Sequence, residues 1–319
     1  MEKVSELINL KNLLLDTKWQ ISVREFSDSI EKFKSYIDFV KSKTKIDNSN
    51  LNATLTDIQS KSSDSVDALD EYIKNIDSLI RDCDGELREM SVKLDQASNT
   101  DSPEQILKKI SDREKTHHEF TKSLFIERCK IYSNWEYPGM HIRPGNGTWT
   151  RNIVDLDPLY LVDIHQELLE PIKKTFNEHY RSRLRFKTIS DIDKPIFEQF
   201  PDNQFGLIVA TEFFNQKSLG TIKRYLNEVF SLLKDGGMFI FTFNNCDFPE
   251  GARNSEHNYD CYTPGNEVKE IAKTIGFEII DNVTSNGTLS WIEVRRPGVL
   301  NSLRGGQPLA RIKQNHKNN

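Results

Sequence analysis

The second half of the chain alternates between short apolar runs and segments of helical periodicity, and this alternation restricts the possible folds more than any other feature. Strands that alternate with helices form a doubly wound α/β sheet with parallel central strands. Two further strands, expected at 277–283 and 289–294 with a turn between them, would close the sheet with an antiparallel edge. The strands expected before that pair are 139–142, 159–163, 184–189, 205–210 and 238–243.

The segments between these strands carry helix patterns of different strength. Residues 167–179 place apolar side chains on one side, and the runs 220–233 and 267–274 each end close to glycine. A shorter helix is expected over 148–154, directly after the glycine pair Gly145 and Gly147.

The first half of the chain repeats its apolar residues in alternating steps of four and three, which is the seam of a coiled coil. One seam runs from Trp19 to Val40, and a second runs from Val66 to Leu94. One helix cannot bury so narrow a stripe alone. The two helices must therefore pack on each other as an antiparallel hairpin or on copies in another chain, and the sequence leaves both open.

A third helix is expected to start at Pro103 and run towards Ile126, since Ser102 is a good N-cap and Gln105 completes a capping box. The pair His117-His118 within it is expected to be a solvated helix face and not a metal site, because adjacent helical residues point in different directions.

These patterns divide the chain into three parts. We expect an all-α coiled-coil arm over residues 1–130, the α/β domain over 131–297 and a basic, flexible tail over 298–319. The arm is expected to mediate self-association or docking to a partner protein. After Glu293 the chain has no acidic residue, so the tail could contact nucleic acid, although a solvated terminus is the interpretation we favour.

Composition excludes several classes of protein. The net charge of −5 argues against a surface coated with nucleic-acid-binding charge. No apolar run approaches the ~18 residues of a membrane span, and the first residues lack the pattern of a signal peptide. The four cysteines are far apart and form no C-x-x-C pair, so reduced thiols are expected. Together these features predict a cytoplasmic protein with no membrane association.

The segment most informative about family is Leu-Leu-Lys-Asp-Gly-Gly-Met-Phe-Ile, residues 232–240. It resembles the leucine-lysine-x-glycine-glycine turn into the fifth strand of class I S-adenosylmethionine-dependent methyltransferases. The order and spacing of the expected elements resemble the same family across about residues 135–297. This resemblance implies a Rossmann-like sheet, S-adenosylmethionine as cofactor and methyl transfer to an acceptor that the sequence does not identify.

The resemblance also implies a set of site residues. The turn 144–147 resembles the later part of the family's first glycine motif, and Asp163 ends the second strand where the family keeps an acid for the ribose hydroxyls. Asp191 stands where the family often binds adenine. Glu212 or His165 would orient or deprotonate the acceptor. The expected cofactor-binding residues are Arg143, Gly145, Asn146, Gly147, Asp163, Ile164, Asp191, Ile192 and Thr211.

The first motif departs from the family. Its members usually carry an acid near the end of the first strand and then a first glycine, whereas this chain has His141 and Arg143. Arg143 could pair with the carboxylate at the methionine end of the cofactor or block the pocket, and His141 is expected to be a satisfied core residue. The stretch 211–214 lacks the Asn/Asp-Pro-Pro-aromatic sequence of enzymes that methylate exocyclic amines of DNA bases, which argues against that substrate class.

Other interpretations remain open at the level of sequence. Asp163 could cap the following helix, Asp191 could be a turn residue and Glu212 could face solvent. A nicotinamide enzyme is the nearest rival of similar fold, but Thr150 stands where its fingerprint needs a small residue. The altered first motif also allows a second kind of function, in which an inactive methyltransferase-like domain serves an assembly built through the coiled-coil arm.

Overall fold

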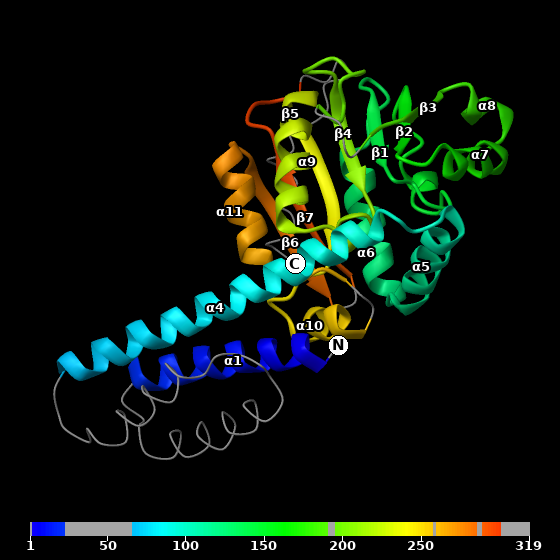
Figure 1. The fold of residues 1–319 in the computed structure, drawn as a ribbon. Coiled ribbons are helices and arrows are strands. Elements are labelled where there is room, and N and C mark those ends of the chain that lie inside the picture. Colours follow the sequence, from blue (N-terminus) through cyan, green and yellow to red (C-terminus); the bar gives the residue numbers. More distant parts are fainter. Residues whose placement is uncertain (1, 23–65, 191–194, 258–259, 286–288, 301–319) are drawn as a thin grey trace.

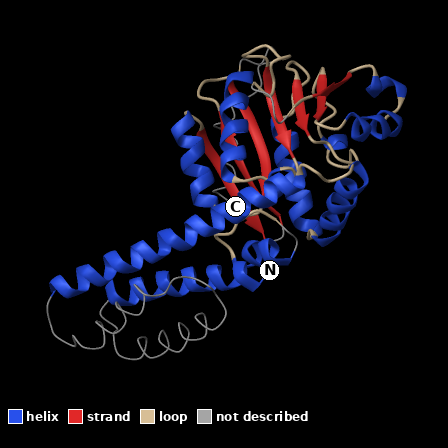
Figure 2. Cartoon of the chain, viewed as in Figure 1, coloured by secondary structure: helices blue, strands red, loops and turns tan. Residues whose placement is uncertain are grey.

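The computed structural model describes residues 2–22, 66–190, 195–257, 260–285 and 289–300. Its centre is a seven-stranded sheet in the order β3-β2-β1-β4-β5-β7-β6 (Figures 1 and 2). The neighbouring pairs from β3 to β5 are parallel, and β7 runs antiparallel to β5 and to β6. The expected doubly wound sheet with an antiparallel hairpin at its C-terminal edge is therefore confirmed. The strands are β1 Gly139–Ile142, β2 Leu159–Asp163, β3 Leu184–Thr188, β4 Phe205–Ala210, β5 Leu233–Phe243, β6 Glu278–Ser285 and β7 Leu289–Arg295.

Helices cover both faces of the sheet. On one face, α9 (Leu219–Leu232) and α11 (Gly265–Ile275) bury apolar side chains such as Ile222 and Val268 against β1, β4 and β5. On the other face, α6 (Glu119–Tyr132) and α7 (Gln166–Thr175) pack against β2 and β4, with Phe125 in edge contact with the ring of Trp291. The central strand β4 is buried along its whole length, as its unbroken apolar run predicts.

Two N-terminal helices lie side by side and project from the body of the molecule (Figure 1). Helix α1 (Glu2–Ser22) runs antiparallel to α4 (Val66–Ser98), since Lys11 pairs with Asp84 and Lys18 pairs with Asp77. Their apolar faces form one cluster with Tyr262 and with Ala252 of α10 (Pro249–His257), so the pair also packs on the α/β body. The first predicted seam, Trp19 to Val40, lies mostly outside the described residues. None of the described helices combines the length and hydropathy that a bilayer span requires.

Several expected helices differ from the observed ones. The predicted helix over 148–154 is wrong, because only a 3₁₀ turn, η1 (Thr150–Asn152), follows the glycines. The helix expected over 167–179 divides into α7 and a short α8 (Glu178–Arg181), where Asn177 caps the second piece. The third helix begins at Pro103 with the predicted capping box, but α5 ends at Thr116 and α6 starts afresh at Glu119.

Candidate functional site

The side chains of interest lie at the carboxyl edge of the sheet, where β1 and β4 are neighbours. The chain proceeds from β1 to β2 on one side of β1, and β4 lies on the other side, so this is the topological switch point of the sheet. Open α/β sheets bind ligands in the crevice outside such a point. Arg143 follows β1, Asp163 ends β2, and Thr211 and Glu212 follow β4. The structure thus brings together four of the residues expected from the sequence.

Two of these residues adopt backbone angles that are unusual for a side-chain-bearing residue. The φ angles are 51° for Arg143 and 56° for Glu212, both in the left-handed region. Backbone strain of this kind persists where the surrounding structure holds it, and it concentrates at ligand-binding and catalytic sites. Here the two strained residues follow the two strands that flank the switch point.

His141 joins the two flanking strands from inside the core. Its Nδ1 lies 2.9 Å from Oγ1 of Thr150 and its Nε2 lies 3.0 Å from Oγ1 of Thr211. Burial lowers the pKa of His141 to about 3. The ring is therefore neutral and fully bonded, as expected for a core residue, and it holds the turn after β1 close to the end of β4.

Asp163 carries an unused hydrogen-bonding atom. Its Oδ1 accepts a hydrogen bond from the backbone N–H of His165 at 3.0 Å, whereas its Oδ2 is buried and has no partner among the described residues. Burial raises the pKa of the Asp163 carboxyl, and the positive charge of Arg143 opposes this. The N-cap position of α7 belongs to His165, so Asp163 does not cap that helix. A buried carboxylate oxygen without a donor is suited to a ligand hydroxyl.

Arg143 presents a buried cation beside Asp163. Its side chain is 5% exposed, and its guanidinium lies over the ring of Phe213 with 4.7 Å to the ring centroid. In the described part of the chain, no carboxylate comes within 4 Å of this guanidinium. A weakly hydrated guanidinium in this position can form a bidentate pair with a ligand carboxylate.

The backbone conformation and the packing of the turn explain why glycine stands at both positions of the first motif, Gly145 and Gly147. Gly145 and Gly147 have φ angles of 57° and 82°, which side-chain-bearing residues rarely adopt. A Cβ at Gly145 would lie 3.1 Å from Cδ1 of Ile110 on α5, and a Cβ at Gly147 would lie 3.4 Å from Cγ2 of Ile172 on α7. Asn146 between them accepts from the backbone N–H of Thr148 and donates to Glu114. The glycines thus permit the turn and its packing against helices.

Glu212 is buried and is the centre of a polar cluster. Its Oε1 lies 2.7 Å from Nε2 of His117, and its Oε2 accepts from Nδ2 of Asn215 at 2.8 Å. Burial opposes ionisation of this carboxyl. The hydrogen bond and charge of His117 and the charge of Arg113 outweigh it, so the pKa of Glu212 is lowered. Glu212 is therefore a buried, ionised carboxylate and does not face solvent.

Helix α5 covers this edge of the sheet, a position that was not predicted from the sequence. Arg113, near the end of α5, lies 3.7 Å from Glu212 and forms a close ion pair with Asp260. The prediction that His117 lies on a solvated face is wrong, because the helix breaks at this point and directs the ring inwards; its side chain is 1% exposed. His118 is instead the N-cap of α6. The only sequence feature that marks the break between α5 and α6 is the pair of adjacent histidines, His117 and His118.

The remaining expected residues have varied surroundings. Ile164 is half-buried against the core, and Nε2 of His165 is buried with no partner among the described residues. Asp191 and Ile192 lie outside the described residues. The loop after β5 is held by its own hydrogen bonds, since Asn244 donates to Gly251 and Ser255 and Asn245 accepts from Gly265. No group of side chains in the described ranges could hold a metal ion.

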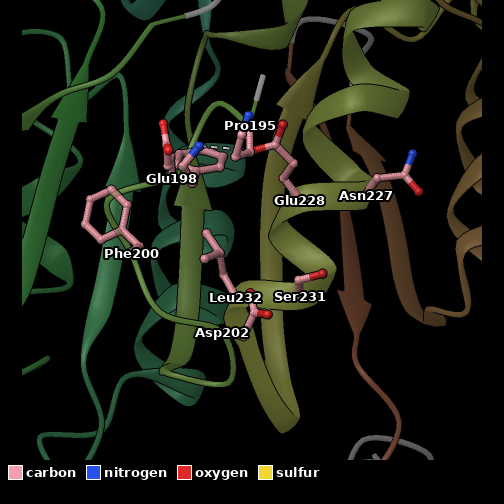
Figure 3. Close-up of a pocket in the computed structure, with 9 residues that line it drawn as sticks. Pro195, Glu198, Phe200, Asp202, Asn227, Glu228, Ser231 and Leu232 are labelled. Carbon is pink, nitrogen blue, oxygen red and sulfur yellow. Dashed lines mark hydrogen bonds between the residues drawn. The ribbon is translucent and has the colours of Figure 1, made fainter. Parts of the chain in front are cut away.

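A separate cavity of about 420 Å³ lies between α9 and the segment 195–202 (Figure 3). Asp202, Ser231 and Leu232 lie at one end of it, next to the amino ends of β4 and β5. Pro195, Glu198 and Glu228 lie towards the other end. Because none of its lining residues follows a strand at the switch point, this cavity is distinct from the site described above.

Comparison with known proteins yields similarity of fold. No family model and no curated protein matches the chain. An O-methyltransferase family protein from Burkholderia thailandensis is 14% identical, with 56% of this chain and 57% of that chain covered and a TM-score of 0.46. The CurJ carbon methyltransferase is 16% identical, with 52% and 50% covered and a TM-score of 0.39. The [4+2]-cyclase SpnF is 16% identical, with 55% and 79% covered and a TM-score of 0.42. At these identities the similarity concerns the fold alone. The strand order and the antiparallel hairpin are those of a Rossmann-like, methyltransferase-type sheet.

Proposed function

We propose that the protein transfers a methyl group from S-adenosylmethionine to an acceptor bound at the carboxyl edge of the sheet. The observation that carries this proposal is the unpartnered, buried Oδ2 of Asp163 at the end of β2. A buried acceptor atom costs free energy unless a donor reaches it, and the hydroxyls of a ribose are donors of suitable chemistry. The buried cation of Arg143, with no described carboxylate within 4 Å, supports the same conclusion.

The residues at this edge fit the groups of the cofactor. Asp163 would accept hydrogen bonds from the ribose, and Arg143 would pair with the carboxylate of the methionine part. Asp191, with Ile192 beside it, would bind the adenine, as the family resemblance implies, and Ile164 would be a further cofactor-binding residue. The bound cofactor supplies a methyl group already activated by a sulfonium, so the protein has mainly to align donor and acceptor.

The remaining assignments belong to the same proposal. Gly145, Asn146 and Gly147 would form the turn beneath the methionine part, and Thr211 would adjoin the methyl group. Glu212 would orient the acceptor, directly or through His117, and His165 is the second candidate for this role. Within residues 1–130, the projecting pair α1 and α4 would act as the arm for self-association or for docking to a partner protein, and residues 298–319 would act as a basic tail.

Calorimetric titration with S-adenosylmethionine and S-adenosylhomocysteine tests the cofactor assignment. We expect micromolar binding by the wild-type chain and about 10- to 150-fold weaker binding by Asp163→Asn, because a hydrogen bond to a charged group contributes about 1.5–3 kcal/mol. Asp155→Asn is the matched control, since Asp155 is exposed and lies before β2, at the opposite edge. The proposal fails if the folded wild-type chain binds neither compound.

A second candidate function is an inactive methyltransferase-like domain in an assembly. The observation in its favour is that α5 packs Arg113 and His117 against Glu212, so the chain's own side chains occupy the end of β4. Absence of cofactor binding together with stable self-association would favour this function over methyl transfer.

A further inference from the structure

One short segment of the chain concentrates positive charge at an edge of the sheet. Residues 173–187 hold six lysine and arginine side chains and one carboxylate, whereas the whole chain has 43 lysines and arginines and 48 acidic residues. The segment forms the end of α7, the short α8 and the strand β3, which gather at the end of the sheet opposite α11 and β6 (Figure 1). The six cations form what we call the basic patch: Lys173, Lys174, Arg181, Arg183, Arg185 and Lys187.

Contacts between α7, α8 and β3 bring these side chains together around the edge strand. The ammonium of Lys173 on α7 lies 5.1 Å from the ring centroid of Phe186 on β3. The guanidinium of Arg183, just before β3, lies 5.4 Å from the ring centroid of Tyr180 on α8. Successive side chains of a strand point to opposite faces, so the neighbours of Phe186 in β3 extend the positive charge to the other face of this edge.

The charges of the basic patch are held in place but are not neutralised. Among the described residues, only Lys173 of the six cations forms an ion pair with a carboxylate, that of Glu170. The three arginines donate instead to backbone carbonyl oxygens, at 3.2 Å for Arg181, 3.0 Å for Arg183 and 2.8 Å for Arg185. Such a bond orients a guanidinium, keeps its full charge and leaves further N–H donors for a ligand. The patch is therefore arranged to receive anionic groups.

Protection of the sheet edge explains only part of this arrangement. In the described sheet β3 pairs with β2 alone, and charged side chains on an edge strand prevent its pairing with another chain. This function accounts for the exposed side chains of Arg185 and Lys187. It does not account for the exposed Arg181 on α8, or for Tyr180, which remains 39% exposed beside Arg183. An exposed aromatic ring among oriented cations is suited to a ligand that has both anionic groups and flat rings.

We propose that the basic patch binds single-stranded nucleic acid. The guanidinium fork matches the geometry of a phosphate, and the ring of Tyr180 offers a surface on which a base can stack. Bases of a single strand are available for such stacking, whereas those of a duplex are already stacked on one another. An anionic membrane fits this surface less well, because Tyr180 is the only exposed large apolar side chain of the segment and interfacial anchoring uses an apolar face. The proposal goes beyond methyl transfer and does not depend on it.

Fluorescence anisotropy of a labelled oligothymidine of about 12 nucleotides, titrated with the full-length chain at several salt concentrations, tests the proposal. Arg185→Gln/Lys187→Gln removes two exposed charges and should weaken binding. It should also reduce the slope of log affinity against log salt concentration by about 1.4, because each phosphate contact on a single strand contributes about 0.7. Lys223→Gln/Lys273→Gln, on α9 and α11, is the matched control: it removes the same charge from exposed positions and should leave the slope unchanged.

A second variant tests the contribution of the aromatic ring. Tyr180→Leu should weaken oligothymidine binding by about 5- to 150-fold, the effect of losing one stacked base. Competition by inorganic polyphosphate, which has the charge but no bases, should be the same in this variant and in the wild type. Phe248→Leu is the control, because Phe248 is also 39% exposed but lies before α10, outside the basic patch.

Each alternative outcome overturns the proposal in a different way. If the folded wild-type chain does not bind oligothymidine, or binds phosphatidylserine vesicles in its place, the ligand class is wrong. Equal salt slopes in the two double variants would place the binding elsewhere in the chain. Unchanged oligothymidine binding by Tyr180→Leu would reduce the patch to a general polyanion surface. A duplex of the same length that binds as tightly as the single strand would contradict the assignment to single strands.

Discussion

Arg128 on α6 and Glu293 on β7 form a bidentate ion pair, although they are 165 residues apart in the sequence. Nε and Nη2 of Arg128 donate to the two carboxylate oxygens of Glu293, each at 2.6 Å. The carboxylate is fully buried, and the hydroxyl of Tyr132 also donates to it at 2.8 Å. This pair ties the last N-terminal helix to the reversed strand of the sheet.

Arg128→Met should therefore destabilise the fold severely. The substitution keeps an apolar stem but leaves Glu293 buried without its cation, a loss that costs about 3–5 kcal/mol for buried pairs. The measurement is the free energy of unfolding from denaturant titration. The matched control is Arg295→Met, because Arg295 pairs with Glu278 in a partly exposed position and should cost about 1 kcal/mol or less. Equal losses in the two variants would contradict this account of the Arg128 pair.

The acid sensitivity of the fold should depend on His141. Its pKa is about 3 in the folded chain against 6.5 in its ordinary state, because burial disfavours the charged ring. Between these values the unfolded chain binds a proton that the folded chain does not. The free energy of unfolding should consequently fall as the pH falls from about 6.5 towards 3, by up to about 1.4 kcal/mol per pH unit.

His141→Gln tests this prediction, because glutamine does not titrate and can still hydrogen-bond to Thr150 and Thr211. Its unfolding free energy should be lower than that of the wild type at pH 7 and should depend less steeply on pH between 6.5 and 4. His179→Gln, at an exposed position, should retain the wild-type slope. A wild-type slope in His141→Gln would mean that other groups dominate the acid response.

Asp163 should reduce stability at neutral pH. Burial raises its folded pKa above the ordinary 3.8, so the folded chain holds a proton that the unfolded chain releases as the pH rises from this value. The wild type therefore loses stability with rising pH relative to Asp163→Asn, whose side chain stays neutral. Denaturation of both proteins at pH 3.5 and pH 7 should give a difference that grows in favour of the variant. A difference that is constant with pH would show that the carboxylate is well accommodated when ionised.

The strand order, the C-terminal hairpin and the start of α5 could be predicted because short stretches of sequence encode them. The strands and the C-terminal hairpin are marked by apolar runs between glycine-rich stops, and the start of α5 by Ser102, Pro103 and Gln105. Short-range patterns of this kind need no knowledge of the tertiary contacts.

The carboxyl edge was less predictable because its contacts are non-local. His117 and Glu212 are 95 residues apart, and no periodicity links them. The pattern of α5 continues across His117 towards α6, so the break that turns the ring inwards has no strong sequence signal. The prediction of a helix after the glycines was wrong because tertiary contacts also determine the backbone there. The backbone there is held by the packing of Gly145 against Ile110 and of Gly147 against Ile172, and only one 3₁₀ turn forms.

Arg143 offers a direct choice between two roles, as partner of the cofactor carboxylate or as an obstacle in the pocket. Arg143→Met removes the charge and keeps much of the bulk. As a partner, its loss should weaken S-adenosylhomocysteine binding by about 10- to 150-fold, because hydrogen bonds to charged groups contribute about 1.5–3 kcal/mol. Binding of 5′-methylthioadenosine, which lacks the amino-acid carboxylate, should change little, so the ratio of the two affinities isolates the contact. As an obstacle, Arg143 would behave differently: Arg143→Ala, which also removes the bulk, should then bind both compounds more tightly than the wild type. The burial of this cation and its coulombic effect on Asp163 favour the first outcome, since Arg143 has no ion pair with a carboxylate among the described residues.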